Sequence, residues 1–156
     1  MRARGEAGTV RGTGVNVNQY GLVLPVLALV AWTFVMWVWM YATRIPAMQK
    51  ANIDPKELAR TGAKLELPPE VARVADNYNH LHEQPTIFYA LALAAQIAGA
   101  TDATNVGLAW VYVALRVVHS CIQATVNIIM LRFTVFALGT LALLGLLVRT
   151  LVALLG

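Results

Sequence analysis

Four long apolar runs restrict the fold of this chain more than any other feature of its sequence. A helix needs about 20 mainly apolar residues to cross a bilayer, and the runs lie at about 20–43, 69–98, 103–129 and 131–155. Hydrophobic residues make up 58% of the chain and charged residues 13%, whereas soluble domains carry about 25% charged residues. This composition excludes an ordinary soluble domain and predicts an all-α integral membrane protein.

The segments between the apolar runs predict how the helices are arranged. Only the connector 44–68 is long, and its DPKE sequence at Asp54 is typical of a capped helix start. The turn after the second run is short, with Asp102 or Thr104 as the expected N-cap, and the last two runs are almost continuous. Because consecutive helices with short links pack antiparallel, we expect an up-and-down four-transmembrane-helix bundle in residues 20–156.

Lysine and arginine residues predict the orientation of the bundle. Five of them lie between residues 44 and 64, three lie in the N-terminal tail, and none lies in the turn between the second and third helices. Because cytoplasmic loops are enriched in these residues, we expect the connector on the cytoplasmic side and both termini on the opposite side. Topology then explains the net charge of +4, and we expect no nucleic-acid partner.

Residues 1–19 form a polar, glycine-rich segment without periodicity. We expect a disordered tail, or an upstream extension of the reading frame, rather than a cleaved signal peptide. A signal peptide has a short apolar region followed by small residues, whereas the apolar run here is long and ends in WVWMYATR.

Two polar stripes interrupt the second and third apolar runs. The first has positions i, i+3, i+4, i+7, i+10 and i+11 and comprises Arg73, Asp76, Asn77, His80, Glu83 and Gln84. The second has positions i, i+3, i+4, i+7 and i+11 and comprises Arg116, His119, Ser120, Gln123 and Asn127. Each spacing places its side chains on one helix face. An ionisable side chain in hydrocarbon costs at least about 2.5–3.5 kcal/mol, so we expect both faces to meet partners or water.

The two stripes can serve three roles. They can hold helices or subunits together, with Arg116 against Glu83 and Arg73 against Asp76 as the expected ion pairs. They can form the proton or substrate path of a small membrane transporter. They can also enclose a ligand.

An excess of arginines at one level favours a ligand site. Arg44 ends the first predicted helix and Arg132 begins the fourth, at the cytoplasmic level where the stripes converge. The guanidinium group matches carboxylate oxygens, and Glu83 can take an ammonium group. We therefore expect a small zwitterionic or peptide-like ligand.

Other chemistries are not expected from this sequence. His80 and Glu83 are spaced to share a metal ion, but no further ligands cluster with them, so we expect no metal site. His119 and Ser120 are adjacent on a helix and do not face each other, which excludes a catalytic pair. The single cysteine, Cys121, lies in an apolar run and is expected to be a buried small hydrophobe.

The polar residues and their spacing are similar to those of a known family. The relevant features are Arg44, the segment from Arg73 to Glu83 with a proline before FYALAL, the LRVVHS motif, and Arg132 sixteen residues after Arg116. Together they resemble the MAPEG family, the membrane-associated proteins in eicosanoid and glutathione metabolism, and the HEQP block resembles its bacterial branch. The resemblance covers about residues 20–155.

This resemblance implies a homotrimer of four-helix bundles in a bacterial inner membrane, with glutathione as a co-substrate bound between neighbouring subunits. The implied activity is a transferase or peroxidase that conjugates or reduces lipophilic electrophiles arriving through the lipid. Arg132 is the implied catalytic residue, because a guanidinium beside a thiol stabilises the nucleophilic thiolate. The positions that match the family, together with residues of the two polar stripes, are the expected glutathione contacts: Arg44, Arg73, Asp76, His80, Glu83, Gln84, Arg116, Ser120 and Gln123.

Several positions depart from the family pattern. His80 stands where the family commonly has an asparagine, and Asp76 where animal members tend to carry an arginine. Phe133 and Phe136 stand where the prostaglandin-forming relatives have a serine and a tyrosine, and Gln123 replaces a tyrosine. These changes remove hydrogen-bond donors near the thiol and alter the charge of the site, so they bear on activity more than on fold.

Overall fold

The computed structural model describes residues 21–62 and 67–156, and these residues form helices and no strands. The predicted disordered tail, residues 1–19, lies outside the described residues. The helices are α1 (Val23–Lys50), α2 (Pro55–Thr61), α3 (Pro69–His80), α4 (Gln84–Ile97), α5 (Ala103–Ala124) and α6 (Ile129–Leu155). The all-α prediction is therefore confirmed.

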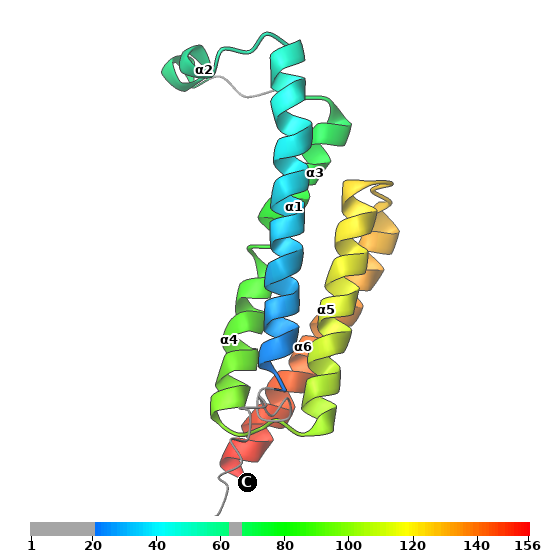
Figure 1. The fold of residues 1–156 in the computed structure, drawn as a ribbon. Helices are drawn as coiled ribbons and strands as arrows, with labels where there is room; N and C mark the ends of the chain where they lie inside the picture. Colours follow the sequence, from blue (N-terminus) through cyan, green and yellow to red (C-terminus); the bar gives the residue numbers. More distant parts are fainter. Residues whose placement is uncertain (1–20, 63–66) are drawn as a thin grey trace, which may run out of the picture.

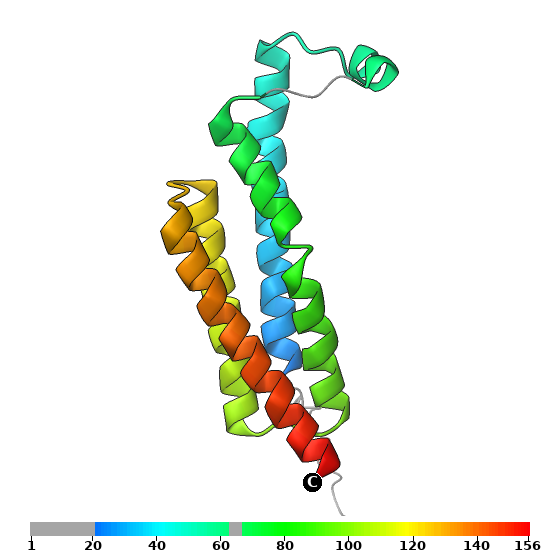
Figure 2. The ribbon, with the colours of Figure 1, turned by 180° about the vertical axis from the view of Figure 1, so that it is seen from behind.

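α1, the pair α3 and α4, α5 and α6 run in alternating directions along one long axis, and α2 lies to the side (Figure 1). α3 and α4 return beside α1, α5 runs back, and α6 packs against α5 along its length. α1 begins and α6 ends at the same end of the molecule, whereas α2 and the connector lie at the other end (Figure 1). Figure 2 shows that the α5–α6 link lies toward the connector end, which is also the end that holds α3.

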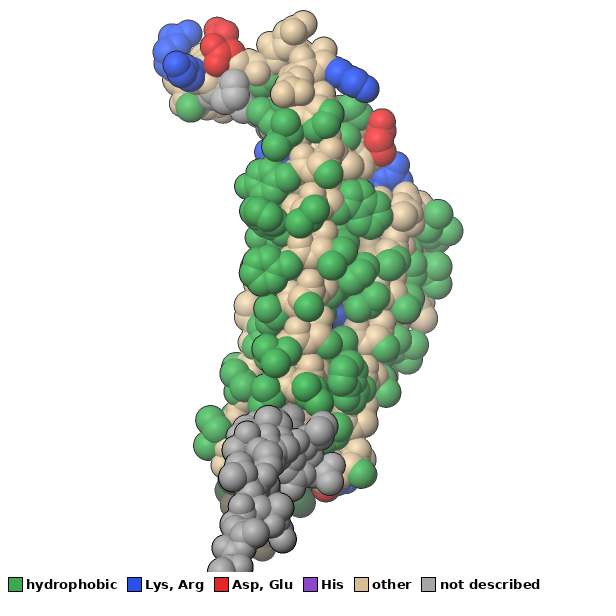
Figure 3. All heavy atoms as spheres, viewed as in Figure 1, with side chains coloured by type: hydrophobic (Ala, Val, Ile, Leu, Met, Phe, Trp, Pro, Cys, Tyr) green, Lys and Arg blue, Asp and Glu red, His purple; other side chains and the backbone are tan. Residues whose placement is uncertain are grey.

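Apolar side chains cover the outside of this arrangement. α1, α5 and α6 are each long and apolar enough to cross a membrane. Many large hydrophobic side chains on them are exposed, and in Figure 3 such side chains cover the flank while most charged ones lie near the ends. Water would disfavour so large an apolar surface, and lipid would not. The chain is thus an integral membrane protein.

The second predicted helix, 69–98, is not continuous. It is interrupted at residues 81–83, between α3 and α4 (Figure 2). Pro85 explains the interruption, because proline has no N–H and its ring would clash with the carbonyl of Leu81 in a regular helix. Glu83 has φ −93° and ψ −99°, which is not helical. The break turns the residues on its two sides toward different faces.

Two other helix ends also differ from the prediction. The first helix does not stop at Arg44 but continues through Pro46 to Lys50, since proline within a membrane helix removes only one backbone hydrogen bond. The third ends at Ala124 instead of 129, because Asn127 adopts a left-handed conformation with φ 51°. Asparagine tolerates this conformation better than most residues, and Asn127 lies within the link 125–128 to α6.

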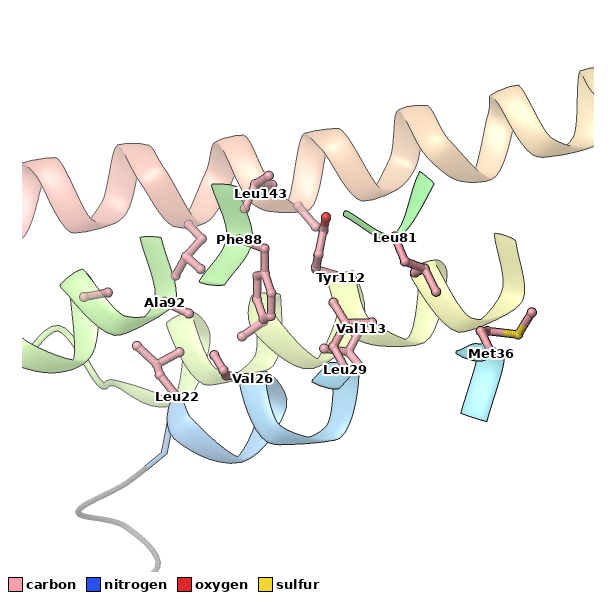
Figure 4. Close-up of a cluster of buried hydrophobic side chains, with 14 of the residues drawn as sticks. Leu22, Val26, Leu29, Met36, Leu81, Phe88, Ala92, Tyr112, Val113 and Leu143 are labelled. Atoms are coloured by element: carbon pink, nitrogen blue, oxygen red, sulfur yellow. The ribbon is translucent and has the colours of Figure 1, made fainter. Parts of the chain in front are cut away.

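The hydrophobic core lies where α1, α4, α5 and α6 meet (Figure 4). At its centre the Phe88 and Tyr112 rings stack with centroids 4.6 Å apart, and both side chains are almost fully buried. Leu29 of α1 and Leu143 of α6 complete this layer. Cys121, expected to be buried, is exposed. The apolar run around it predicted burial but did not show that this face of α5 points outward.

Asp102 ties the start of α5 to the end of α6. As the expected N-cap, its carboxylate accepts hydrogen bonds from the backbone N–H groups of Thr104 and Asn105, and it pairs with Arg149 at 3.0 Å. Arg149 also donates to Asn105 Oδ1 at 2.7 Å. Desolvation acts to raise the pKa of Asp102, but the two amides and the guanidinium outweigh it and hold this pKa below its ordinary 3.8.

The first prediction concerns the core. Phe88→Ala should lower the free energy of unfolding in detergent by about 3–5 kcal/mol, because the substitution removes buried contacts and leaves a cavity. The neighbouring Ile87 is 59% exposed, so Ile87→Ala should change stability by no more than about 0.5 kcal/mol. Equal effects of the two substitutions would contradict the orientation of α4.

The second prediction concerns Asp102. Asp102→Asn keeps a capping oxygen and removes the charge, so it should lower the melting temperature at neutral pH. A depressed pKa contributes stability that is present above the ordinary pKa and lost as pH falls through the folded pKa. The melting difference from wild type should therefore vanish on acidification below pH 3.8.

Asp54→Asn is the matched control, because Asp54 caps only the short connector helix, through Lys56 N–H at 2.8 Å. It should leave the melting temperature unchanged across the same pH range. A difference between Asp102→Asn and wild type that persists unchanged in acid would show that charge is not the cause.

Candidate functional site

A pocket of about 450 Å³ opens between the end of α3, the second half of α5 and the start of α6. Three of its lining residues belong to the first turns of α6, and Figure 2 shows that this end of α6 lies toward the connector end of the bundle. Its wall combines basic or titratable groups with apolar ones, and its lining residues are His80, His119, Ile129, Arg132, Phe133 and Phe136. We call it the Arg132 pocket.

Arg132 is fixed by the turn that precedes it. Asn127, in the left-handed conformation, directs its side-chain oxygen forward to the first turn of α6, where it accepts a hydrogen bond from Arg132 at 2.5 Å. The Nε of Arg132 is buried and has no hydrogen-bond partner. The guanidinium thus keeps its charge beside the pocket and is positioned by a neutral amide.

Arg116 lies behind the same pocket and is only 2% exposed. It donates to the Gln84 side-chain oxygen and, at 3.1 Å, to the Tyr112 hydroxyl. Its guanidinium lies 4.8 Å from the centroid of the Phe136 ring, which lines the pocket. One terminal nitrogen, NH1, is buried without a partner.

The predicted ion pair between Arg116 and Glu83 is therefore wrong. The helix break is the reason, because it directs Gln84 at the start of α4 toward α5 and turns Glu83 outward. Gln84 is held in place by a hydrogen bond to Thr140 of α6 at 2.9 Å. The Glu83 side chain is 65% exposed and bonds to the ring of His80 instead, with Nδ1 and Oε2 2.7 Å apart.

The predicted pair between Arg73 and Asp76 is also wrong. Arg73 donates to the backbone carbonyl of Thr125, just beyond the end of α5, and Asp76 is exposed. Carbonyls beyond a helix end have no intrahelical donor, which explains why this one takes the guanidinium. Arg73 and Arg132 are consequently both anchored to the α5–α6 link.

Carboxylates do not neutralise these three arginines. In the described part of the chain, the ion pairs within 4.0 Å are Arg60 with Glu57, His80 with Glu83, and Arg149 with Asp102. Arg73, Arg116 and Arg132 thus bring three cations to one region with only neutral oxygens as partners. Such a region attracts anions.

Polar atoms without partners are also buried between α3 and α5. They are the amide of Asn77, the hydroxyl of Ser120 and the side-chain oxygen of Gln123, all in residues at most 5% exposed. A buried polar group left unpaired costs about 1–3 kcal/mol, so native structures rarely keep several together. Water, a ligand or a partner subunit is expected to complete these hydrogen bonds.

The structure thus brings together part of the predicted site. His80 and Arg132 line the pocket, Gln84 and Arg116 lie directly behind it, and Glu83 holds His80 from its open side. Arg73, Ser120 and Gln123 belong to the polar region beside it. Arg44 is half-buried in α1 and does not line the pocket, and Asp76 is exposed.

The geometry adds residues to the expected set of glutathione contacts, some of which the sequence had singled out for other reasons. Tyr112 contacts Arg116 from one turn earlier, and that i, i+4 spacing was a usable signal. His119, on the second polar stripe, and Phe136 line the pocket. Nothing in the sequence predicted that Asn127 would reach forward to Arg132. No group of three or more metal-ligating side chains occurs in residues 21–62 and 67–156.

Comparisons with known proteins identify the family of this chain. No curated protein and no solved structure gives a significant match to the chain. The sequence profile of the MAPEG family, however, matches residues 22–152 and so covers α1 to α6 with their connections, including every residue of the Arg132 pocket. With most of its length matched, the chain belongs to the MAPEG family.

Proposed function

We propose that this protein is a membrane-bound glutathione-dependent enzyme of the transferase or peroxidase type, acting on lipophilic electrophiles. The family includes glutathione transferases and peroxidases together with other members. The observation that carries the proposal is a set of three arginines without carboxylate partners: Arg132 lines the open pocket, Arg116 lies behind it, and Arg73 is bound to the neighbouring α5–α6 link.

Glutathione has the charges that this region lacks. Its two carboxylates match guanidinium groups, which bind carboxylates through paired N–H donors. Arg73, Arg116 and Arg132 each keep one buried guanidinium nitrogen without a hydrogen-bond partner, so no described protein group already occupies these donors. The exposed Glu83 carboxylate supplies an acceptor for the ammonium group of the ligand, and its bond to His80 leaves further lone pairs free.

The open face of the pocket supports assembly into a homotrimer. Asp76 and Glu83 are exposed on the single chain, next to apolar surface that faces lipid. A carboxylate facing acyl chains costs about 2.5 kcal/mol or more, so these groups require water or a partner subunit. In the proposed assembly α3 and α4 together form a fourth crossing, the connector faces the cytoplasm, and the membrane is a bacterial inner membrane.

The proposed chemistry of the pocket uses a charged side chain and an apolar surface in its lining. Arg132 stabilises the thiolate of bound glutathione, and the thiolate is the nucleophile. Its sulfur forms a bond to an electrophilic carbon while the leaving group departs with its electron pair. Ile129, Phe133 and Phe136 provide the apolar surface against which a lipophilic substrate lies.

A small transporter is the second candidate, and the interruption between α3 and α4 favours it. Discontinuous helices surround the substrate sites of many transporters, but there they occur in pairs related by an internal repeat. The described residues show one such interruption, at 81–83. Glutathione uptake by proteoliposomes without conjugation would support the transporter and reject the enzyme.

The third prediction tests the ligand. Glutathione at 100 times its dissociation constant should stabilise the detergent-purified protein by roughly 2.7 kcal/mol, because a ligand of the native state adds to its stability. A thermal-shift titration measures this effect. Arg149 is on the same helix but outside the pocket, so Arg149→Ala should leave the glutathione-induced shift unchanged. An absent shift in the wild-type protein would reject the proposed function.

The fourth prediction tests the catalytic arginine. Arg132→Ala should abolish the ultraviolet absorbance of the bound thiolate and the conjugating activity, because the pocket lining contains no other arginine or lysine that could replace the guanidinium. Arg132→Lys should restore part of both, since it restores a positive charge. Thiolate absorbance equal to that of wild type in Arg132→Ala would contradict the role assigned to Arg132.

A further inference from the structure

We propose that His80, held by Glu83, is the base that accepts the thiol proton in the Arg132 pocket. The inference rests on the proposed thiol chemistry and adds a residue to it. Arg132 can stabilise a thiolate but cannot accept its proton, because a guanidinium is already fully protonated. Some other group must take the proton, or it must leave for the solvent.

The hydrogen bond between His80 and Glu83 sets the state of the imidazole. Nδ1 of His80 lies 2.7 Å from Oε2 of Glu83. An ionised carboxylate can only accept a hydrogen bond, so the Nδ1 of a neutral ring must carry the proton. The lone pair is then on Nε2, and Glu83 stabilises the cation that forms when Nε2 is protonated.

The packing around His80 fixes its ring at the pocket. It stacks on Phe136 with centroids 5.7 Å apart and lies 5.1 Å from the ring of His119. His80 lines the pocket together with Arg132 and is partly accessible, with a side chain that is 23% exposed. A thiol bound beside Arg132 is therefore also beside an imidazole whose acceptor nitrogen is not used by Glu83.

Positively charged and titratable groups near His80 are His119 of α5, whose ring it approaches, Arg132 of α6, which lines the same pocket, and Arg116 of α5, which contacts the Phe136 ring on which His80 stacks. Asp76 lies one turn earlier on α3 and is exposed, and among the described residues Glu83 is the carboxylate that pairs with His80 within 4.0 Å. His119 is almost fully buried and forms no ion pair with a described carboxylate. His80 is consequently better placed than His119 to hold a proton.

The proposed step conserves protons and electrons. The S–H bond of the thiol breaks, its electron pair stays on sulfur, and the proton bonds to Nε2 of His80. The products are a thiolate beside Arg132 and an imidazolium beside Glu83. No proton reaches the solvent, which distinguishes this step from thiolate formation driven by Arg132 alone.

Proton counting tests the proposal. Calorimetric titration with glutathione in two buffers of different ionisation enthalpy gives the protons released, and thiolate absorbance gives the thiolate formed. The wild-type protein at about pH 7 should release far less than one proton per thiolate. His80→Asn should release about one, because asparagine keeps a donor for Glu83 but has no group that accepts a proton.

Two further variants keep the result interpretable. His82→Asn is the matched control, because His82 bonds through Nδ1 to the Tyr78 carbonyl at 2.9 Å and lines a different pocket, against α1. It should behave as wild type. Glu83→Gln preserves the shape of the side chain and removes its charge, so the number of protons released per thiolate should rise toward the value for His80→Asn. This variant replaces His80→Asn in the test if His80→Asn does not fold.

The outcomes separate this inference from the proposed function. Release of about one proton per thiolate by the wild-type protein, or equal counts in wild type and both pocket variants, would overturn the role of His80 while leaving the thiolate intact. Glutathione that binds without forming a thiolate would overturn it together with the role of Arg132. Absence of glutathione binding would reject the proposed function itself.

Discussion

The rest of this structure depends on how arginine side chains without carboxylate partners are stabilised inside an apolar helix bundle. Removing a guanidinium from water costs several kcal/mol unless its donors are satisfied. Arg116 is stabilised by Gln84, Tyr112 and the face of Phe136, none of which carries a charge. Its positive charge, with those of two neighbouring arginines, is therefore available to a ligand or a partner subunit.

The break between α3 and α4 decides how polar side chains are divided around that charge. Pro85 prevents a continuous helix, so Gln84 turns inward to α5 while Glu83 turns to the open side and holds His80. On a regular helix both residues would have continued the polar stripe that begins at Arg73. The division leaves a cationic interior, a carboxylate at the opening and an imidazole between them, which is the arrangement that our proposed chemistry uses.

Much of the fold could be predicted from the sequence, because lipid imposes strong rules on length and polarity. The apolar runs predicted the long apolar helices α1, α5 and α6. The preference of Asp and Thr for the N-cap position predicted a cap at Asp102 or Thr104, and Asp102 is the residue that caps α5. Contacts across helices could not be predicted. Both expected ion pairs failed, since helical spacing places residues on a face but does not reveal a break at 81–83 or a left-handed Asn127.

The central claim is that the surplus arginine charge serves a bound anionic peptide and not subunit contacts alone. A structure of the protein in lipid nanodiscs with glutathione tests it most directly. Our account predicts the tripeptide in the Arg132 pocket, with its sulfur beside Arg132 and its carboxylates on unpartnered guanidinium nitrogens. Carboxylates of a neighbouring subunit bound to Arg73, Arg116 and Arg132, with no space left for a ligand, would contradict it.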